Sequence, residues 1–290
     1  VYISAGLDER YAVKHPECLV KFTPDQPHDF LNTAGYHLLC FNTPYMDELL
    51  AQTREVVEKY RPEEIFFDIC DIRPCYCNCC LASMREKGYD PHNGADVYEH
   101  GREVYYRAAE RMREAVQSIS PDTDVFFNAG RVPMNDRRFS SYDTHLELES
   151  LPTGGWGYDH FPMSALYSRT LGKEYLGMTG KFHTTWGEFG GFKHPNALRY
   201  ETSLSLALGA KCSVGDQLHP SGKVNLSTYR LIGRAYADVE RKEPWCRDVR
   251  PVADAAIITL EPPTGANRMM LEKKYLYEIV DPYSDISGYK

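Results

Sequence analysis

Two spacings of apolar residues alternate along the chain, and together they predict strands that are each followed by a helix. Short apolar runs typical of buried strands lie at 1–6, 65–69, 125–128, 145–149, 182–188 and 212–216. Apolar residues at helical spacing lie at 45–60, 94–118, 162–171, 196–208 and 229–240. Strands that alternate with helices in this way favour an α/β fold with parallel strands and right-handed crossovers.

The predicted strands share a second property, because each of them ends in polar or acidic residues. These strand-end residues are Asp8, Glu9, Asp68, Asn128, Glu147, Glu149, Glu188 and Asp216. A (β/α)₈ barrel carries its chemistry at the carboxyl ends of all its strands, whereas a doubly wound sheet does so only near its switch point. We therefore expect a TIM-type (β/α)₈ barrel.

The predicted β-α units are too few to complete a barrel. We expect its N-terminal β-α units to be missing from the chain or to come from another chain, and we expect the barrel portion to span residues 1–249. The pattern changes near Pro251, where a fresh apolar run at 255–258 follows the last barrel helix. Residues 250–290 are therefore predicted to be the truncated beginning of a second α/β domain.

Composition narrows the classes of function. The 290-residue chain has a formal net charge of −8, which argues against a nucleic-acid partner because such proteins usually carry a basic patch. No apolar run approaches the roughly 18 residues of a membrane span and no signal peptide opens the chain, so we expect a cytoplasmic protein without a membrane partner. Neither a phosphate-binding loop nor a dinucleotide-binding glycine motif occurs, and no organic cofactor is expected.

The strongest chemical signal is the cysteine-rich run CYCNCC at 75–80. Cys75, Cys77 and Cys80 can deliver three thiolates from one short loop, and Zn²⁺ prefers such ligands in tetrahedral sites. We expect Cys40 to be the fourth ligand, because it lies just before a predicted helix at the same end of the barrel. A site closed by four thiolates is structural, since catalytic zinc keeps an open position. Cys18 and Cys79 are the spare cysteines, and unligated thiols on a loop are the alternative to a metal site.

Two of the strand-end carboxylates have the properties of a glycosidase pair. Glycoside hydrolysis uses two carboxyl groups, which lie about 5–5.5 Å apart when configuration is retained. Asp68 and Glu188 belong to predicted strands that are three apart, which lets them face each other across a barrel mouth. Glycines around Glu188 let a ligand approach closely, and Asp68 follows apolar neighbours. The alternatives are a helix N-cap or a salt bridge to Arg73 for Asp68, and a surface-loop position for Glu188.

Further side chains near the predicted strand ends are candidates for contacts with a sugar. The candidates for binding hydroxyl groups are Asn128, Glu147, Glu149, Asp216 and His219, and the candidates for stacking on a sugar ring are Trp156 and Trp186. Structural pairing of the two glutamates with arginine and turn chemistry around His219 are the alternatives.

The order of features between residues 40 and 80 resembles the β-galactosidases of glycoside hydrolase family 42. The run CFNTPY at 40–45 is followed by a helix, a strand that ends in an acid and the cysteine run at 75–80. In that family, four cysteines spread in this way bind zinc and a glutamate on the seventh strand is the nucleophile, a position that Glu188 matches. The resemblance also implies a flavodoxin-like domain from about Pro251 onward.

The fourth strand departs from that family. Family 42 has Asn-Glu at this position and uses the glutamate as the acid/base, whereas this chain has Phe67-Asp68. A strand ending in aromatic-x-Asp is similar to the α-L-fucosidases of family 29, in which the fourth-strand aspartate is the nucleophile. With the run WGEFGG at 186–191, the chain most resembles the group described as hypothetical glycosyl hydrolases, which lies near both families.

These resemblances imply a retaining exo-glycoside hydrolase that cleaves off a terminal galactose- or fucose-like sugar. Family 42 makes Glu188 the nucleophile and Asp68 the acid/base, and family 29 exchanges the two roles. The rival functions are a carbohydrate-binding barrel without turnover and a zinc-dependent hydrolase that uses the cysteine loop. The expected partner is a glycoside or oligosaccharide substrate, and the sequence leaves a homo-oligomer open.

Overall fold

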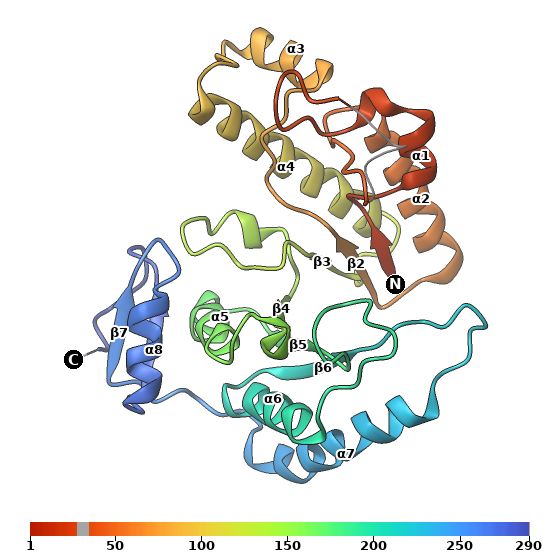
Figure 1. Ribbon diagram of the computed structural model, residues 1–290. Coiled ribbons are helices and arrows are strands. Elements are labelled where there is room, and N and C mark those ends of the chain that lie inside the picture. The colour runs from red at the N-terminus through yellow and green to blue at the C-terminus, as the bar shows by residue number, and fades with distance from the viewer. Residues whose placement is uncertain (28–34, 290) are drawn as a thin grey trace. The chain divides into compact units, whose positions relative to one another are not determined.

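The computed structural model describes residues 1–27 and 35–289, which fold as two compact units. The first unit comprises Val1–Ala129 with Ser141–Thr144, and the second comprises Gly130–Ser140 with His145–Lys290. The strands are β1 (Tyr2–Ser4), β2 (Glu64–Asp68), β3 (Asp124–Phe127), β4 (Leu146–Glu149), β5 (Tyr175–Gly180), β6 (Lys211–Gly215), β7 (Ala255–Ile258) and β8 (Tyr277–Val280). The helices are α1 (Glu9–Lys14), α2 (Tyr45–Tyr60), α3 (Asn78–Lys87), α4 (Gly94–Gln117), α5 (His160–Ser168), α6 (Pro195–Ala207), α7 (Leu226–Lys242) and α8 (Thr264–Glu272) (Figure 1).

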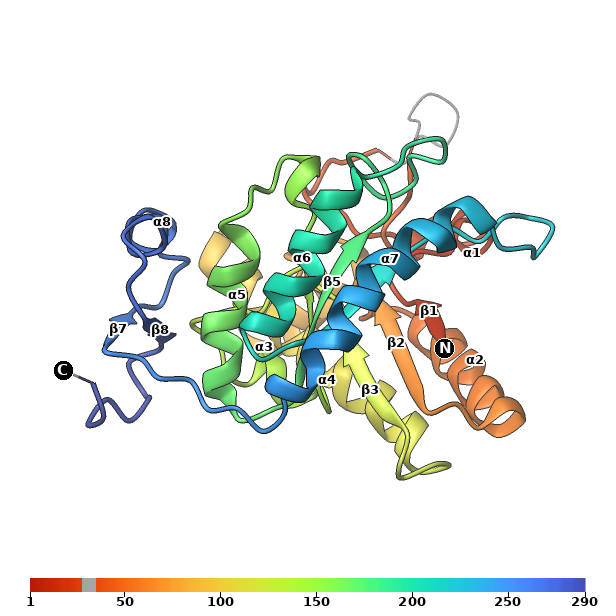
Figure 2. The ribbon, with the colours of Figure 1, turned by 90° about the horizontal axis from the view of Figure 1, so that it is seen from below.

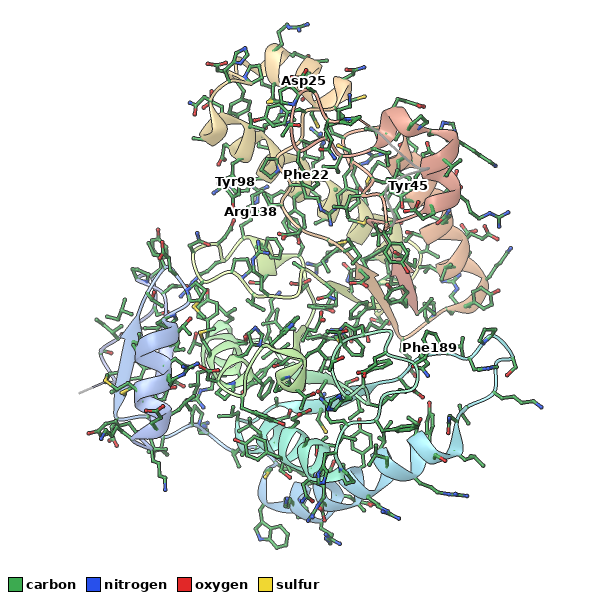
Figure 3. The ribbon with its side chains drawn as sticks, viewed as in Figure 1. Phe22, Asp25, Tyr45, Tyr98, Arg138 and Phe189 are labelled. Carbon is green, nitrogen blue, oxygen red and sulfur yellow. The ribbon has the colours of Figure 1, made fainter. Side chains whose placement is uncertain are left out.

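The first unit is built on a parallel sheet with the strand order β1-β2-β3. Helices α2 and α4 pack against each other and cover the sheet (Figure 2). Tyr45 opens α2 and points into this core, where its hydroxyl group donates to the carbonyl of Ala5 at 2.9 Å (Figure 3). The apolar face of α2 is buried as its helical spacing predicts. The helix ends at Tyr60, and the next residue, Arg61, caps it with a left-handed φ of 45°.

The second unit contains another parallel sheet, with the strand order β4-β5-β6. Helices α5 and α6 pack against these strands, and α7 packs against α6. A small parallel pair of strands, β7 and β8, follows α7, and α8 lies between the two strands in the sequence. This pair packs through β8 on α5, where Tyr167, Tyr277 and Ile279 share one apolar cluster. Residues 250–290 belong to the second unit, and the domain boundary predicted at residue 250 stays a prediction.

The predicted α/β class with parallel strands is confirmed, and the register of each sheet sets which strand ends are neighbours. Within residues 1–27 and 35–289 the strands form three separate sheets rather than one closed barrel. The same residues include no helix that is long and apolar enough to cross a bilayer.

One predicted strand is wrong. Residues 182–188 form a loop, and the strand of this β-α unit is β5, which lies just before them. The sequence YLGMTG of β5 contains two glycines and so lacks the usual signature of a strand. Gly177 is needed there because Phe161 of α5 and Ser205 of α6 close over it: a Cβ atom would lie 2.5 Å from the Ser205 hydroxyl oxygen. Tertiary packing therefore selects a residue that local propensity disfavours.

We predict that Gly177→Ala lowers the free energy of unfolding by about 1–3 kcal/mol, because the added methyl group overpacks the contact between β5 and its covering helices. Gly233→Ala is the matched control, since Gly233 lies in α7 with open space around its Cβ position. Alanine should stabilise that helix by about 0.5–1 kcal/mol. Urea unfolding of both variants checks the opposite signs, and equal stabilities would contradict the packing argument.

Candidate functional site

Asp68 ends β2 in the first unit, and three donors hold its carboxylate. The Tyr2 hydroxyl group of β1 donates to Oδ2 at 2.6 Å, while the Asn128 side-chain amide after β3 donates to Oδ1 at 2.9 Å. The backbone N–H of Ile69 also donates to Oδ1, at 2.8 Å. Both oxygens thus already accept hydrogen bonds from neighbouring strands, and the carboxylate has a fixed orientation.

The backbone directly after Asp68 is strained. Ile69 has a φ of 60°, a left-handed conformation that a β-branched residue rarely adopts. This conformation comes directly after the strand end, where the Ile69 N–H meets the Asp68 carboxylate. Strain of this kind persists where surrounding structure enforces it, and it is frequent at functional sites. The outlier thus lies directly next to the candidate residue Asp68.

Tyr2 is a site residue that the sequence analysis missed. Burial, and then its hydrogen bond to Asp68, holds the pKa of the Tyr2 hydroxyl group well above its ordinary value, so the group stays a proton donor. Register gives the reason for its position: Tyr2 is opposite Phe66, two residues before the Ser4–Asp68 pair. An alternating strand places residues two apart on the same face, and only the pairing of β1 with β2 reveals the contact.

Glu188 lies in the second unit on the loop between β5 and α6, and not at a strand end as predicted. Its Oε2 atom accepts hydrogen bonds from the Thr184 backbone N–H at 2.6 Å and from the Thr184 hydroxyl group at 2.8 Å. These bonds lower the pKa of Glu188 from its ordinary value of 4.5, the hydroxyl contributing most. The Oε1 atom lies 3.9 Å from the Nδ1 atom of His183.

Two buried lysines fix the loop that carries Glu188, and neither was recognised from the sequence. Lys181 is fully buried and donates to the carbonyls of Phe189 and Gly191 at 3.0 and 3.2 Å. Phe189 itself points outward and is 59% exposed, so the contact uses its backbone alone (Figure 3). At the other end of the loop Lys193 donates to Glu201 of α6 at 2.6 Å. The loop is therefore built around internal cations.

Trp186, on the same loop, lies over the ends of β5 and β6. Its indole N–H donates to the Oε1 atom of Glu149, at the end of β4, at 2.6 Å. A Cβ atom on Gly215 would lie 2.5 Å from the indole ring, and one on Gly180 would lie 3.1 Å from it. Three neighbouring strand ends thus place one partly exposed aromatic side chain, and two of them must be glycine to make room for it.

The remaining predicted sugar contacts are distributed over the second unit. Glu147 of β4 pairs with the Nε2 atom of His145 at 3.2 Å, and its predicted contact with a sugar stays a prediction. Trp156 is partly exposed and its ring meets His160 edge-on. Asp216 follows β6 and accepts a hydrogen bond from the Gln217 N–H, as is typical of a turn.

His219 has the weakest position among the predicted contacts. It is exposed, and its Nδ1 atom is engaged by the hydroxyl group and the backbone N–H of Ser221, at 2.7 and 3.1 Å. The ring is held by turn chemistry, which is the alternative that the sequence left open.

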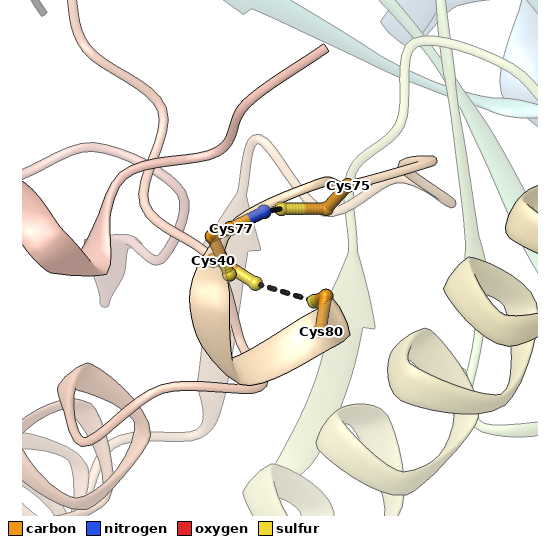
Figure 4. A group of neighbouring side chains, drawn as sticks. All are labelled: Cys40, Cys75, Cys77 and Cys80. Atoms are coloured by element: carbon orange, nitrogen blue, oxygen red, sulfur yellow. Dashed lines mark hydrogen bonds between the residues drawn. The ribbon is translucent and has the colours of Figure 1, made fainter. Parts of the chain in front are cut away.

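The four predicted metal ligands come together in the first unit. Their sulfur atoms all lie within 4.8 Å of one another, and all four side chains are buried: Cys40, Cys75, Cys77 and Cys80 (Figure 4). The Cys40 and Cys80 sulfurs are 3.5 Å apart, too far for a disulfide and close to the edge of about 3.8 Å that a tetrahedron with 2.3 Å zinc–sulfur bonds has. Four thiolates in this geometry fit a metal ion with a closed tetrahedral shell.

The chain is similar over its full length to solved glycoside hydrolases. It shares 51% identity and a TM-score of 0.96 with α-L-fucosidase isoenzyme 2 from Paenibacillus thiaminolyticus, covering 100% of this chain and 46% of that one. The β-galactosidase from Bacillus circulans sp. alkalophilus is 14% identical with a TM-score of 0.77. This match covers 100% of this chain and 56% of the β-galactosidase chain. A GH42 β-galactosidase from G. stearothermophilus is 13% identical with a TM-score of 0.75, again over 100% and 56%.

These comparisons confirm the resemblance to glycosyl hydrolases that the sequence indicated. The two β-galactosidases show a shared fold, whereas the fucosidase is also a close relative in sequence. The chain spans about half the length of these solved proteins. No protein-family model matches the chain, and no curated protein matches it.

We predict that Thr184→Val raises the pKa of Glu188 toward its ordinary value of 4.5, because the hydroxyl donor contributes most to lowering it. A lowered carboxylate pKa stabilises the loop when the group is ionised, and this contribution disappears as the pH falls through the lowered pKa. In the variant this contribution should be smaller, and its loss should be complete at a higher pH. Carbon-detected NMR titration of the glutamate carboxyl groups measures the shift, with Glu188→Gln to assign the signal.

Thr185→Val is the control, since the neighbouring Thr185 is exposed and only its backbone carbonyl meets Glu188. Its pKa curve for Glu188 should overlay that of the unaltered protein. An unchanged Glu188 titration in Thr184→Val would show that the hydroxyl group does not hold the carboxylate.

Proposed function

We propose that the protein is a retaining exo-glycoside hydrolase that removes a terminal α-L-fucose-like sugar. The observation that carries this proposal is the 51% identity and 0.96 TM-score to an α-L-fucosidase over the whole chain. A galactose-like substrate is placed second, because the β-galactosidases share only 13–14% identity and so support the fold alone. The substrate partner is thus a fucoside or fucosyl oligosaccharide.

Asp68 is proposed as the nucleophile. A retaining mechanism needs one ionised carboxylate that is oriented toward the anomeric carbon and one carboxylic acid that protonates the leaving oxygen. The Tyr2 hydroxyl group, the Asn128 amide and the Ile69 N–H together donate to both Asp68 oxygens, and this fixed orientation supports the role of nucleophile. The role agrees with the family 29 alternative and reverses the family 42 assignment.

Glu188 is proposed as the general acid and base. Both loop donors reach its Oε2 atom, so Oε1 is free to carry a proton. Its lowered pKa in the free protein has to rise for this role, and exclusion of water by a bound sugar acts in that direction. The carboxylate is half-buried before any ligand binds, and a sugar over the loop would desolvate it further.

The sugar ring is proposed to stack on Trp186, with Trp156 as a second aromatic contact. Both side chains are partly exposed, as a stacking surface must be. The hydroxyl groups are proposed to meet the polar side chains at the strand ends, namely Asn128, Glu147, Glu149, Asp216 and His219. Glu149 accepts the indole N–H of Trp186 at its Oε1 atom, which places this carboxylate beside the proposed stacking surface.

A structural zinc ion is proposed for the four-cysteine cluster. The spacing of the sulfur atoms and the burial of all four ligands support it. Zinc would tie the loop before α2 to the start of α3, since Cys40 belongs to the former and Cys77 and Cys80 to the latter. Four protein ligands leave no open position for a substrate, which argues against the zinc-dependent hydrolase.

Three broader expectations accompany this function as proposals. The sheets β1-β2-β3 and β4-β5-β6 are proposed to be portions of one TIM-type barrel, in line with the fold of the β-galactosidases. Residues 250–290 are proposed to begin the second, flavodoxin-like domain, in which β7, α8 and β8 would be the first elements. A cytoplasmic location is also kept as a proposal.

The catalytic roles predict opposite products in azide rescue. Asp68→Ala and Glu188→Ala should each lower the hydrolysis of an aryl α-L-fucoside by about 10³-fold or more, which corresponds to about 4 kcal/mol of barrier. Added azide should give a fucosyl azide of inverted configuration with Asp68→Ala and of retained configuration with Glu188→Ala. Product configuration is read by NMR.

Asp122→Asn and Glu174→Gln are controls, since both are exposed acids outside the proposed site, and they should keep the unaltered rate. Exchanged azide products would restore the family 42 roles. A protein that binds fucose but releases none from aryl fucosides or galactosides would instead be the carbohydrate-binding barrel.

The metal proposal predicts one zinc ion per chain in the purified protein. Cys77→Ser should lose the ion and melt at a lower temperature, because binding energy of the metal is folding energy. Cys79→Ser is the matched control. The Cys79 thiol adjoins the cluster in sequence but is not part of it, so the zinc content should be unchanged. Elemental analysis with thermal unfolding decides, and equal zinc content in both variants would contradict the ligand set.

A further inference from the structure

Asn42 contacts the cysteine cluster from two directions. Its backbone N–H donates to the Cys40 sulfur at 3.4 Å, which matches the N–H of Cys77 on the Cys75 sulfur, also at 3.4 Å (Figure 4). Its side-chain amide donates to the Cys79 carbonyl at 3.3 Å and to the Cys80 sulfur at 3.7 Å. One residue thus bridges the Cys40 loop and the first turn of α3 through donors alone.

Arg107 of α4 determines which end of that amide faces the sulfur. Its guanidinium group donates to the Asn42 Oδ1 atom at 2.6 Å. An arginine side chain has donors and no acceptor, so it can hydrogen-bond only to the oxygen end of an amide. The NH₂ end of Asn42 must then point toward Cys80. The arginine is exposed, and together with Asn42 it lines an open surface cavity.

Charge explains why such donors matter here. Four thiolates around a divalent ion leave a formal excess of two negative charges, and the four side chains are at most 4% exposed. Water cannot solvate this charge, so neighbouring N–H groups have to do so. Each N–H on a sulfur draws electron density from it, and the distant guanidinium group strengthens the amide donor by polarising it.

We propose that Asn42 and Arg107 form a relay that tunes the metal centre, with Asn42 as the donor to the thiolates and Arg107 as the positioning residue that fixes its orientation. This inference rests on the metal centre proposed above. It predicts that the cluster's affinity for metal and the electronic properties of its sulfurs depend on Arg107, an exposed residue of α4 that is distant in sequence from all four cysteines.

The test measures metal binding and not turnover. Zinc affinity is determined by competition with a chromophoric chelator, and the cobalt-loaded protein is examined by absorption spectroscopy. Asn42→Ala should weaken zinc binding by about 10- to 100-fold, the usual range for loss of a partner that supports a ligand. The thiolate-to-cobalt charge-transfer band should move to lower energy, because the sulfurs keep more electron density. Arg107→Met should shift both in the same direction by less.

Additivity shows whether Arg107 acts through Asn42. In the Asn42→Ala background, Arg107→Met should have no further effect on affinity or on the cobalt spectrum. Arg111→Met is the matched control: Arg111 lines the same cavity, but it pairs with Asp47 at 2.8 Å, and it should change neither readout.

Three results would overturn the proposal. They are a zinc affinity of Asn42→Ala within twofold of the unaltered protein, an unmoved charge-transfer band, and equal effects of Arg107→Met and Arg111→Met. If Asn42→Ala fails to fold, the comparison of the two exposed arginines and their cobalt spectra still decides. An unaltered protein that binds no metal would refute the metal centre itself, a different outcome from a metal site that ignores Asn42.

Discussion

Parallel pairing of strands is the constraint on which the candidate site depends. Parallel strands bring their carboxyl ends to the same edge of a sheet, so residues far apart in sequence become neighbours without any further device. In the first unit this pairing joins Asp68 to Asn128 across 60 positions. In the second unit it sets Glu149, Gly180 and Gly215 side by side beneath Trp186. Each sheet thus gathers candidate polar or aromatic side chains at its own carboxyl edge.

The sequence predicted those parts whose signal is local. Helix α2 matches its predicted span because its apolar spacing and flanking Pro44 lie within one window. The cysteines were recognisable because three of four ligands share one short loop. Strand β5 was missed for the opposite reason. Its glycines make room for the side chains of Phe161, Ser205 and Trp186, none of which lies within the strand. The error then moved Glu188 from a loop to a strand end.

The groups that hold the candidate carboxylates could not be read from the sequence. Tyr2 reaches Asp68 only through the register of β1 on β2, and Lys181 reaches its carbonyl partners only after the loop has folded back. Periodicity reports which face a residue occupies, but it carries no information on the partner across a sheet or loop. Positions that break local rules, such as Ile69 with its left-handed backbone, are therefore where a sequence analysis is least informative and a structure most so.

Buried charge gives the loop between β5 and α6 a definite shape. A lysine without solvent is costly unless it is paired, and removal of its partners would leave that cost uncompensated. Lys181 meets this demand with two backbone carbonyls and with the rings of Phe182 and Phe192, each 4.8 Å from its ammonium group. Those carbonyls are available only when residues 189–191 fold back over β5. Burial of this cation therefore favours a loop conformation in which residues 189–191 fold back, and the same loop carries Trp186 and Glu188.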